Sequence, residues 1–136
     1  MKNFYSCVDT LIPSPLSEQH LIIKNKAQKE SGAITAYASE EYRAIASQPW
    51  IFQKLSETKD LDGVVFFTAN QFNHGNNFNL KLFNKILNNN YEIHFAREDL
   101  SFSKKNINTK IIDYLFSYSL VIHKNENELF DMLENE

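Results

Sequence analysis

Short apolar runs alternate along the chain with apolar residues at helical spacing, and this pattern predicts alternating strands and helices. Strands are expected at residues 3–8, 33–37, 64–69 and 92–96. The run VVFFTA at 64–69 is the clearest of the four because it is almost continuously apolar. Such a run is typical of a strand that is covered by helices on both faces of its sheet.

The helices between these strands have recognisable ends. Ser17 is a good N-cap for the first helix, and Gly32 suits the C′ position after its last turn. Ser47 is expected to cap a second helix that carries Pro49 in its first turn. The third helix covers residues 80–87, where apolar residues recur at three- and four-residue spacing, and a run of asparagines ends it.

The other segments are less regular. Loops are predicted at residues 9–15, 70–79 and 97–103, and residues 39–47 form either a loop or a short helix. The later part of the chain predicts a helix at 107–120, with a strand near 118–122 as the alternative, and an acidic helix at 124–136.

A β-α-β-α-β-α-β-α order at this spacing indicates an α/β fold with right-handed crossovers. We expect a three-layer sandwich with a mainly parallel sheet of four to five strands, in the resolvase-like or flavodoxin-like order 2-1-3-4. The 136 residues fit a single domain over residues 1–136. Hydrophobic residues make up 43% of the chain, which is enough for one core and excludes a disordered protein.

Charge and cysteine content limit the possible partners and the cellular compartment. A net charge of −3 disfavours a nucleic-acid partner. The single cysteine, Cys7, excludes an intrachain disulfide and fits a reducing compartment. The N-terminal residues lack the apolar run of a signal peptide, and no stretch has the roughly 18 apolar residues of a membrane span. We therefore expect a cytoplasmic protein without a membrane partner.

Several familiar sites are missing from the sequence. There is no G-x-G-x-x-G or P-loop pattern, which disfavours a nucleotide held by a Gly-rich turn. There is no H-x-E, H-E-x-x-H or C-x-x-C pattern either, which disfavours zinc. We therefore expect neither a cofactor nor a metal ion.

In open α/β sheets, ligands bind beyond the carboxyl ends of the strands, so polar residues there are the candidates. Glu41 and Tyr42 follow the second strand and could do acid–base work; the alternative is a solvated turn. His94 lies near the end of the fourth strand, and Glu98 comes four residues later. A histidine there can carry protons near neutral pH, although a buried, hydrogen-bonded histidine is the alternative. The candidate catalytic residues are Glu41, His94 and Glu98, and the candidate substrate-binding residues are Ser6, Gln19, Tyr42, Asn70, Gln71 and Arg97.

The order of elements resembles the catalytic domain of serine recombinases. The resemblance covers a tyrosine in the first strand, a glutamine near the start of the first helix, and DGVVF at the third strand. Matching the family's Y-x-R-V-S-T pattern to residues 5–10 places Cys7 at its arginine and Asp9 at its nucleophilic serine. The resemblance therefore implies the fold and not strand exchange.

A closer match is the sporadic carbohydrate cluster protein family, small proteins encoded among bacterial surface-polysaccharide genes. Four stretches over most of residues 3–122 resemble that family, while the first-strand turn VDT departs from the expected Ser-Arg-Pro-like turn. The stretches are QHLII (19–23), SEEY (39–42), LDGVVF (61–66) and IHFAREDL (93–100). The resemblance implies a pathway context and no settled reaction.

Two functions follow as expectations. The first is a protein of bacterial surface-carbohydrate biosynthesis that binds or acts on a small sugar or sugar nucleotide at the carboxyl ends of the strands. The alternative is a non-catalytic, recombinase-like module that binds a protein partner or forms a homodimer. Its contact would be the apolar stripe of Ile111, Ile112, Leu115 and Phe116.

Overall fold

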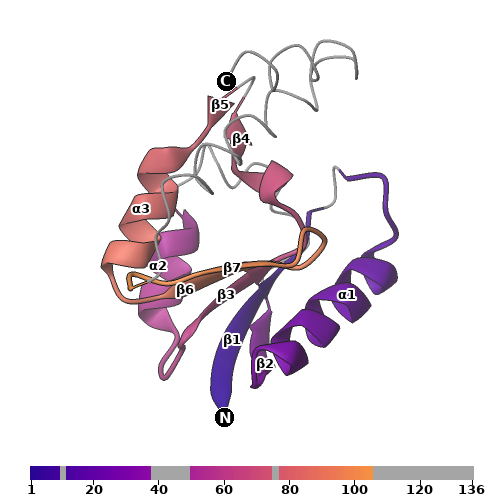
Figure 1. The fold of residues 1–136 in the computed structure, drawn as a ribbon, viewed down its shortest axis with the longest axis horizontal. Coiled ribbons are helices and arrows are strands. Elements are labelled where there is room, and N and C mark those ends of the chain that lie inside the picture. The colour runs from indigo at the N-terminus through magenta and orange to yellow at the C-terminus, as the bar shows by residue number, and fades with distance from the viewer. Residues whose placement is uncertain (10–11, 38–49, 75–76, 106–136) are drawn as a thin grey trace.

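The computed structural model describes residues 1–9, 12–37, 50–74 and 77–105. Strands and helices alternate over most of this length (Figure 1). The elements are β1 (Lys2–Cys7), α1 (Leu16–Lys29), β2 (Gly32–Tyr37), α2 (Trp50–Glu57), β3 (Gly63–Phe66), a 3-10 helix (Ala69–Phe72), β4 (Asn73–His74), β5 (Asn77–Phe78), α3 (Leu80–Asn88), β6 (Glu92–Phe95) and β7 (Leu100–Phe102).

Five strands form the main sheet in the order β2-β1-β3-β6-β7. The first four are parallel, and β7 pairs antiparallel with β6. β3 lies in the centre, where Val64 is opposite both Tyr5 of β1 and Ile93 of β6. The structure confirms the predicted α/β fold. The predicted order 2-1-3-4 is found with β6 as the fourth strand, and β7 follows as an antiparallel edge strand.

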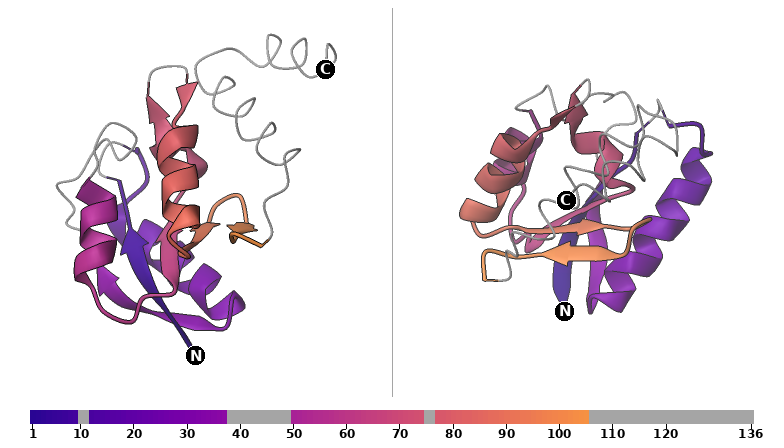
Figure 2. Two further views of the ribbon diagram at one scale, coloured as in Figure 1. Left: turned by 90° about the vertical axis from the view of Figure 1, so that its left-hand side faces the viewer. Right: turned by 45° about the horizontal axis from the view of Figure 1, so that its top comes forward.

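Helices cover both faces of this sheet, with α1 on one face and α2 and α3 on the other (Figures 1 and 2). Side chains alternate across each strand and therefore enter two separate cores. On the α1 face, Phe4, Val65 and Phe67 pack with Ile23 and Ala27 of the helix. The opposite core is larger and includes Tyr5, Cys7, Val64, Phe66, Leu55, Leu82, Phe83, Ile86, Leu87 and Phe95.

Phenylalanine rings fill the larger core. The ring centre of Phe83 lies 5.1 Å from that of Phe102 and 5.7 Å from that of Phe78. Phe72 meets Phe66 edge-on at 4.7 Å and also contacts Phe95 at 5.6 Å. Because aromatic rings bury large areas and favour such edge-to-face geometry, this cluster fixes α3 against the sheet.

Both predicted ends of the first helix are wrong. The N-cap is Pro15 and not Ser17, since the Pro15 carbonyl already accepts a bond from the Gln19 amide at 3.0 Å. Gly32 does not end the helix but begins β2, after Ser31 has taken the left-handed conformation with φ 62°. A Cβ on Gly32 would collide with the Phe4 ring, so a close approach explains this glycine.

Some strand boundaries also differ from expectation. β3 ends at Phe66 and not at Ala69, because Gln71 draws the following backbone into the 3-10 helix. The expected loop at 70–79 includes most of that helix and the short antiparallel pair β4–β5, and the expected loop at 97–103 contains β7. The segments predicted at 39–47, 107–120 and 124–136, with the proposed cap Ser47, lie outside the described residues.

We predict that Phe83→Ala lowers the free energy of unfolding by about 3–5 kcal/mol, because it leaves a cavity among four phenylalanine rings. Urea unfolding followed by circular dichroism measures the change. Leu21→Ala is the matched control, since Leu21 is 58% exposed on α1 and its loss should change stability by under about 0.5 kcal/mol. Equal losses in the two variants would contradict this core.

Candidate functional site

The loop after β1 is shaped by Gln19 from the first turns of α1. Its side-chain oxygen accepts a bond from the Asp9 amide at 3.0 Å, and its amide group donates to the carbonyls of Asp9 and Ser14, both at 3.0 Å. Gln19 is fully buried. Its hydrogen-bonding groups are thus used by the protein, so it acts as a support for the loop and not as a direct ligand contact.

Gln71 supports the segment after β3 in the same way, through hydrogen bonds to the backbone. Its side-chain oxygen accepts from the Thr68 amide at 3.0 Å, and its amide group donates to the carbonyl of Cys7 at 3.1 Å. The second bond ties the end of β3 to the end of β1. Because these bonds are buried, removing Gln71 would leave backbone groups unpaired at the carboxyl edge of the sheet.

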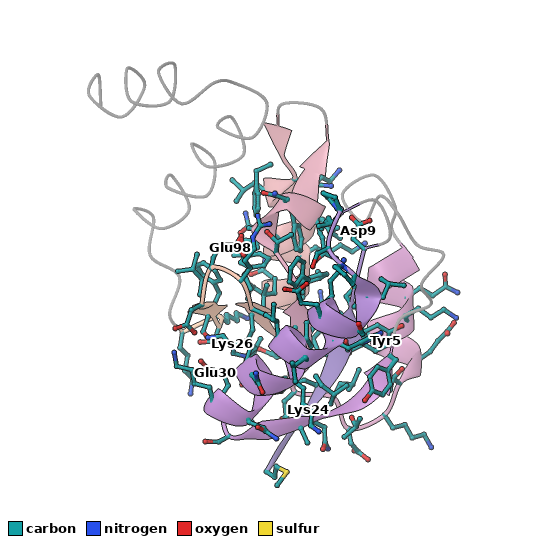
Figure 3. All side chains as sticks on the ribbon, turned by 90° about the vertical axis from the view of Figure 1, so that its right-hand side faces the viewer. Tyr5, Asp9, Lys24, Lys26, Glu30 and Glu98 are labelled. Atoms are coloured by element: carbon teal, nitrogen blue, oxygen red, sulfur yellow. The ribbon has the colours of Figure 1, made fainter. Side chains whose placement is uncertain are left out.

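Glu98 lies in the turn after β6 and binds the segment that follows β3. Its carboxylate accepts a short 2.6 Å bond from the Thr68 hydroxyl and 3.2 Å bonds from the Ala69 amide. The Arg97 side chain is 40% exposed, with Nε 4.0 Å from the Glu98 carboxylate and its guanidinium 5.7 Å from the centre of the Phe67 ring. Figure 3 shows Glu98 and Asp9 toward the same end of the molecule.

Two oxygens near this edge have no hydrogen-bond partner among the described residues. They are Oγ of Ser6, which is 2% exposed, and Oδ1 of Asn70. Asn70 directly follows the Ala69 amide that Glu98 binds. Buried polar atoms are usually paired, so an unpaired one calls for an explanation such as a water molecule or a ligand.

The structure places His94 in a different cluster from Glu98. The His94 ring faces the α1 side, edge-on to Phe4 at 4.9 Å. Its Nε2 lies 2.9 Å from the Glu92 carboxylate, and its Nδ1 lies 2.8 Å from the Ser101 hydroxyl. Of the predicted site residues, the carboxyl edge therefore brings together Ser6, Gln19, Asn70, Gln71, Arg97 and Glu98, and His94 lies apart from them.

The His94 cluster continues to the C-terminal half of α1. The Ser101 hydroxyl is 2.9 Å from the Glu30 carboxylate, and Glu30 accepts a 2.8 Å bond from Lys26. Lys26, whose side chain is 4% exposed, also binds Asp99 at 2.8 Å. In Figure 3, Lys26 of α1 and Glu30, which directly follows that helix, lie away from Glu98.

Charge pairing and burial shift the pKa values of several side chains in this cluster. Lys26 and Lys29 hold the pKa of Asp99 at about 2. The bond from Lys26 lowers the pKa of Glu30. Burial lowers the pKa of His94 below its usual value and outweighs the opposing effect of Glu92 and Glu30, while Lys26 adds to the lowering. His94 is therefore neutral at pH 7.

A neutral His94 has a defined tautomer. The Glu92 carboxylate can only accept, so Nε2 carries the hydrogen and Nδ1 is an acceptor for the Ser101 hydroxyl. The Ser101 proton then has two acceptors, Nδ1 and Glu30. The cluster lines a cavity of about 170 Å³ whose walls are Lys2, Glu30, Glu92, His94, Ser101, Phe102 and Ser103.

Sequence reasoning missed most of this cluster. The sequence pattern predicts a loop at Ser101, whereas this residue lies in β7, opposite His94 in the sheet. The alternation Leu100-Ser101-Phe102 was the signal that could have identified this strand. Glu41 and Tyr42 lie outside the described residues, as does the apolar stripe of the homodimer alternative.

No protein-family model matches the chain, and no curated protein sequence or solved structure matches it. In the described part of the chain, none of the helices has the length and apolar character needed to cross a membrane. Among the same residues, no three histidine, cysteine, aspartate or glutamate side chains gather in a way that could hold a metal ion.

We predict that His94 titrates below pH 6.5 in the folded protein, as measured by NMR of its ring protons. Because the unfolded chain then takes up the proton first, the free energy of unfolding falls as the pH is lowered from about 7 through the folded pKa. His94→Gln keeps a donor and an acceptor but does not titrate, so this part of the pH dependence disappears. An unchanged pH dependence in His94→Gln would refute the assignment.

Proposed function

We propose that this domain binds a small, hydroxyl-rich anionic ligand, a sugar nucleotide or an acidic sugar, at the carboxyl edge of its sheet. The observation that carries the proposal is the unpartnered, buried Asn70 Oδ1 in the segment that Glu98 and Gln71 hold in place. The location agrees with the rule that open α/β sheets bind ligands beyond their carboxyl ends.

Two further features support this class of ligand. The partly exposed Arg97 guanidinium is positioned against Phe67 and suits a phosphate or carboxylate group. Amide and hydroxyl groups such as those of Asn70 and Ser6 suit the hydroxyls of a sugar. Gln19, Gln71 and Glu98 act in this proposal as positioning residues, because their polar atoms already bind the protein backbone and Thr68.

The biological setting in this proposal is the cytoplasm and bacterial surface-carbohydrate biosynthesis. It rests on the resemblance of residues 93–100 and the three other stretches to the sporadic carbohydrate cluster protein family. The proposal does not depend on catalysis, since binding at this edge would serve an enzyme or a binding module alike.

The test is isothermal titration of the full chain with UDP-glucose, UDP-N-acetylglucosamine and glucuronate. We expect at least one of these compounds to bind, and Arg97→Gln to weaken that binding by at least about tenfold, because a charge-assisted contact is lost. Lys81→Gln, an equal change of charge at an exposed position on α3, is the matched control and should bind as the unaltered protein does.

Absence of binding by all three compounds would overturn the proposed ligand class. If Arg97→Gln leaves binding unchanged, the proposed location of the ligand beside Arg97 would be overturned. Circular dichroism of both variants establishes that they are folded before either result is interpreted.

A further inference from the structure

We infer that the cavity beside His94 is a second site, in which Ser101 is a nucleophile toward small activated acyl esters. This site is separate from the carboxyl edge. The assignment rests on a chain of side-chain contacts in which Ser101 meets one nitrogen of His94 and Glu92 meets the other.

The contacts have the geometry that nucleophilic catalysis requires. The hydroxyl oxygen of Ser101 is 2.8 Å from Nδ1, and Nε2 is 2.9 Å from Glu92. A nucleophile within hydrogen-bond reach of a base, with that base held by a third group, is the arrangement that activates serine. Which ring nitrogen faces the serine does not matter chemically, because either nitrogen of imidazole can accept a proton.

The base of this site is buried and its nucleophile is exposed. His94 is 2% exposed, so its ring is fixed between Phe4 and its two polar partners. Ser101 is exposed on β7 and lines the cavity, where a substrate can reach its oxygen. The cavity volume of about 170 Å³ suits a short acyl group.

The charges around the base are balanced. Glu92 is paired with Lys2 at 2.8 Å, and Glu30 with Lys26 at the same distance. Glu92 can therefore orient His94 and stabilise the imidazolium that forms when the ring takes a proton. Lys2 also lines the cavity, with its ammonium group held by Glu92.

The reaction balances without any further reagent than water. Ser101 Oγ forms a bond to the ester carbonyl carbon while its proton passes to Nδ1 of His94. That proton then moves to the departing alkoxide oxygen as the ester bond breaks, which leaves an acyl-serine. Water attacks the acyl group in the same way, its proton passes through Nδ1 to Ser101 Oγ, and the products are an acid and an alcohol.

Glu30 opposes the transfer of the Ser101 proton to His94. Its carboxylate lies 2.9 Å from the Ser101 hydroxyl and competes with Nδ1 for the single proton. Attack on a substrate requires the Ser101 hydroxyl to turn from Glu30 toward Nδ1 of His94. The reactivity of Ser101 must then follow the neutral form of His94 and rise with pH through its pKa.

The test uses diisopropyl fluorophosphate, which phosphorylates activated serines, with the site of labelling found by mass spectrometry. Trypsin releases residues 98–104 as one peptide that contains both Ser101 and Ser103, and fragmentation separates the two. We expect the label on Ser101, none after Ser101→Ala, and unchanged labelling after Ser103→Ala. Ser103 lines the same cavity and is therefore the matched control.

The role of His94 is tested in the same experiment. His94→Gln should slow labelling by about 100-fold or more, whereas His20→Gln, on α1, should leave the rate unchanged. A burst of one equivalent of p-nitrophenol from p-nitrophenyl acetate is the second readout, and it should share the dependence on Ser101 and His94. Circular dichroism again establishes that each variant is folded.

Every outcome decides the question. Labelling of Ser101 that depends on His94 establishes the site. Folded protein without label on Ser101, or labelling of Ser101 at the same rate in His94→Gln, overturns it. Neither result depends on whether sugar nucleotides bind at the carboxyl edge, so this inference and the proposed function fail separately.

Discussion

The position of β3, paired on both sides and buried on both faces, is the constraint on which the other parts of the structure depend. Its four residues are all buried, so alternate side chains must find apolar partners above and below the sheet. The approach of β6 is so close that a Cβ on Gly63 would lie 2.8 Å from that of Glu92. β3 carries no polar side chain, and the polar clusters of the described residues lie past its carboxyl end and on other strands of the sheet.

The two faces of the sheet meet this constraint differently. The α2–α3 face is closed by a phenylalanine cluster, whereas α1 contributes few buried apolar residues and leaves the β6–β7 side of its face to polar groups. A polar group removed from water is costly unless it is paired. Both ring nitrogens of His94 are accordingly bonded, and Lys26 and Asp99 join α1 to the turn between β6 and β7.

Two polar centres of different character result within the described residues. At the carboxyl edge, Gln19, Gln71 and Glu98 form hydrogen bonds to backbone groups of the loops, and these bonds fix the backbone there. Beside α1, a neutral histidine lies between a serine and a carboxylate at an open cavity. The first centre is built from bonds to the backbone, whereas the second is built from contacts between ionisable and hydroxyl side chains.

The amino-acid sequence was sufficient to predict the four parallel strands and the helices between them, because continuous apolar runs such as residues 64–69 and the helical spacing at 80–87 are local signals of burial. The edge strand β7 lies where the sequence predicts a loop. The sequence also drew attention to His94 and Glu98. The folded arrangement shows that these two belong to different clusters, and that Ser101, Glu92 and Glu30 surround the histidine. Residues 71 positions apart, such as Glu30 and Ser101, meet only after α1 has packed on the sheet, so no spacing along the chain indicates that contact.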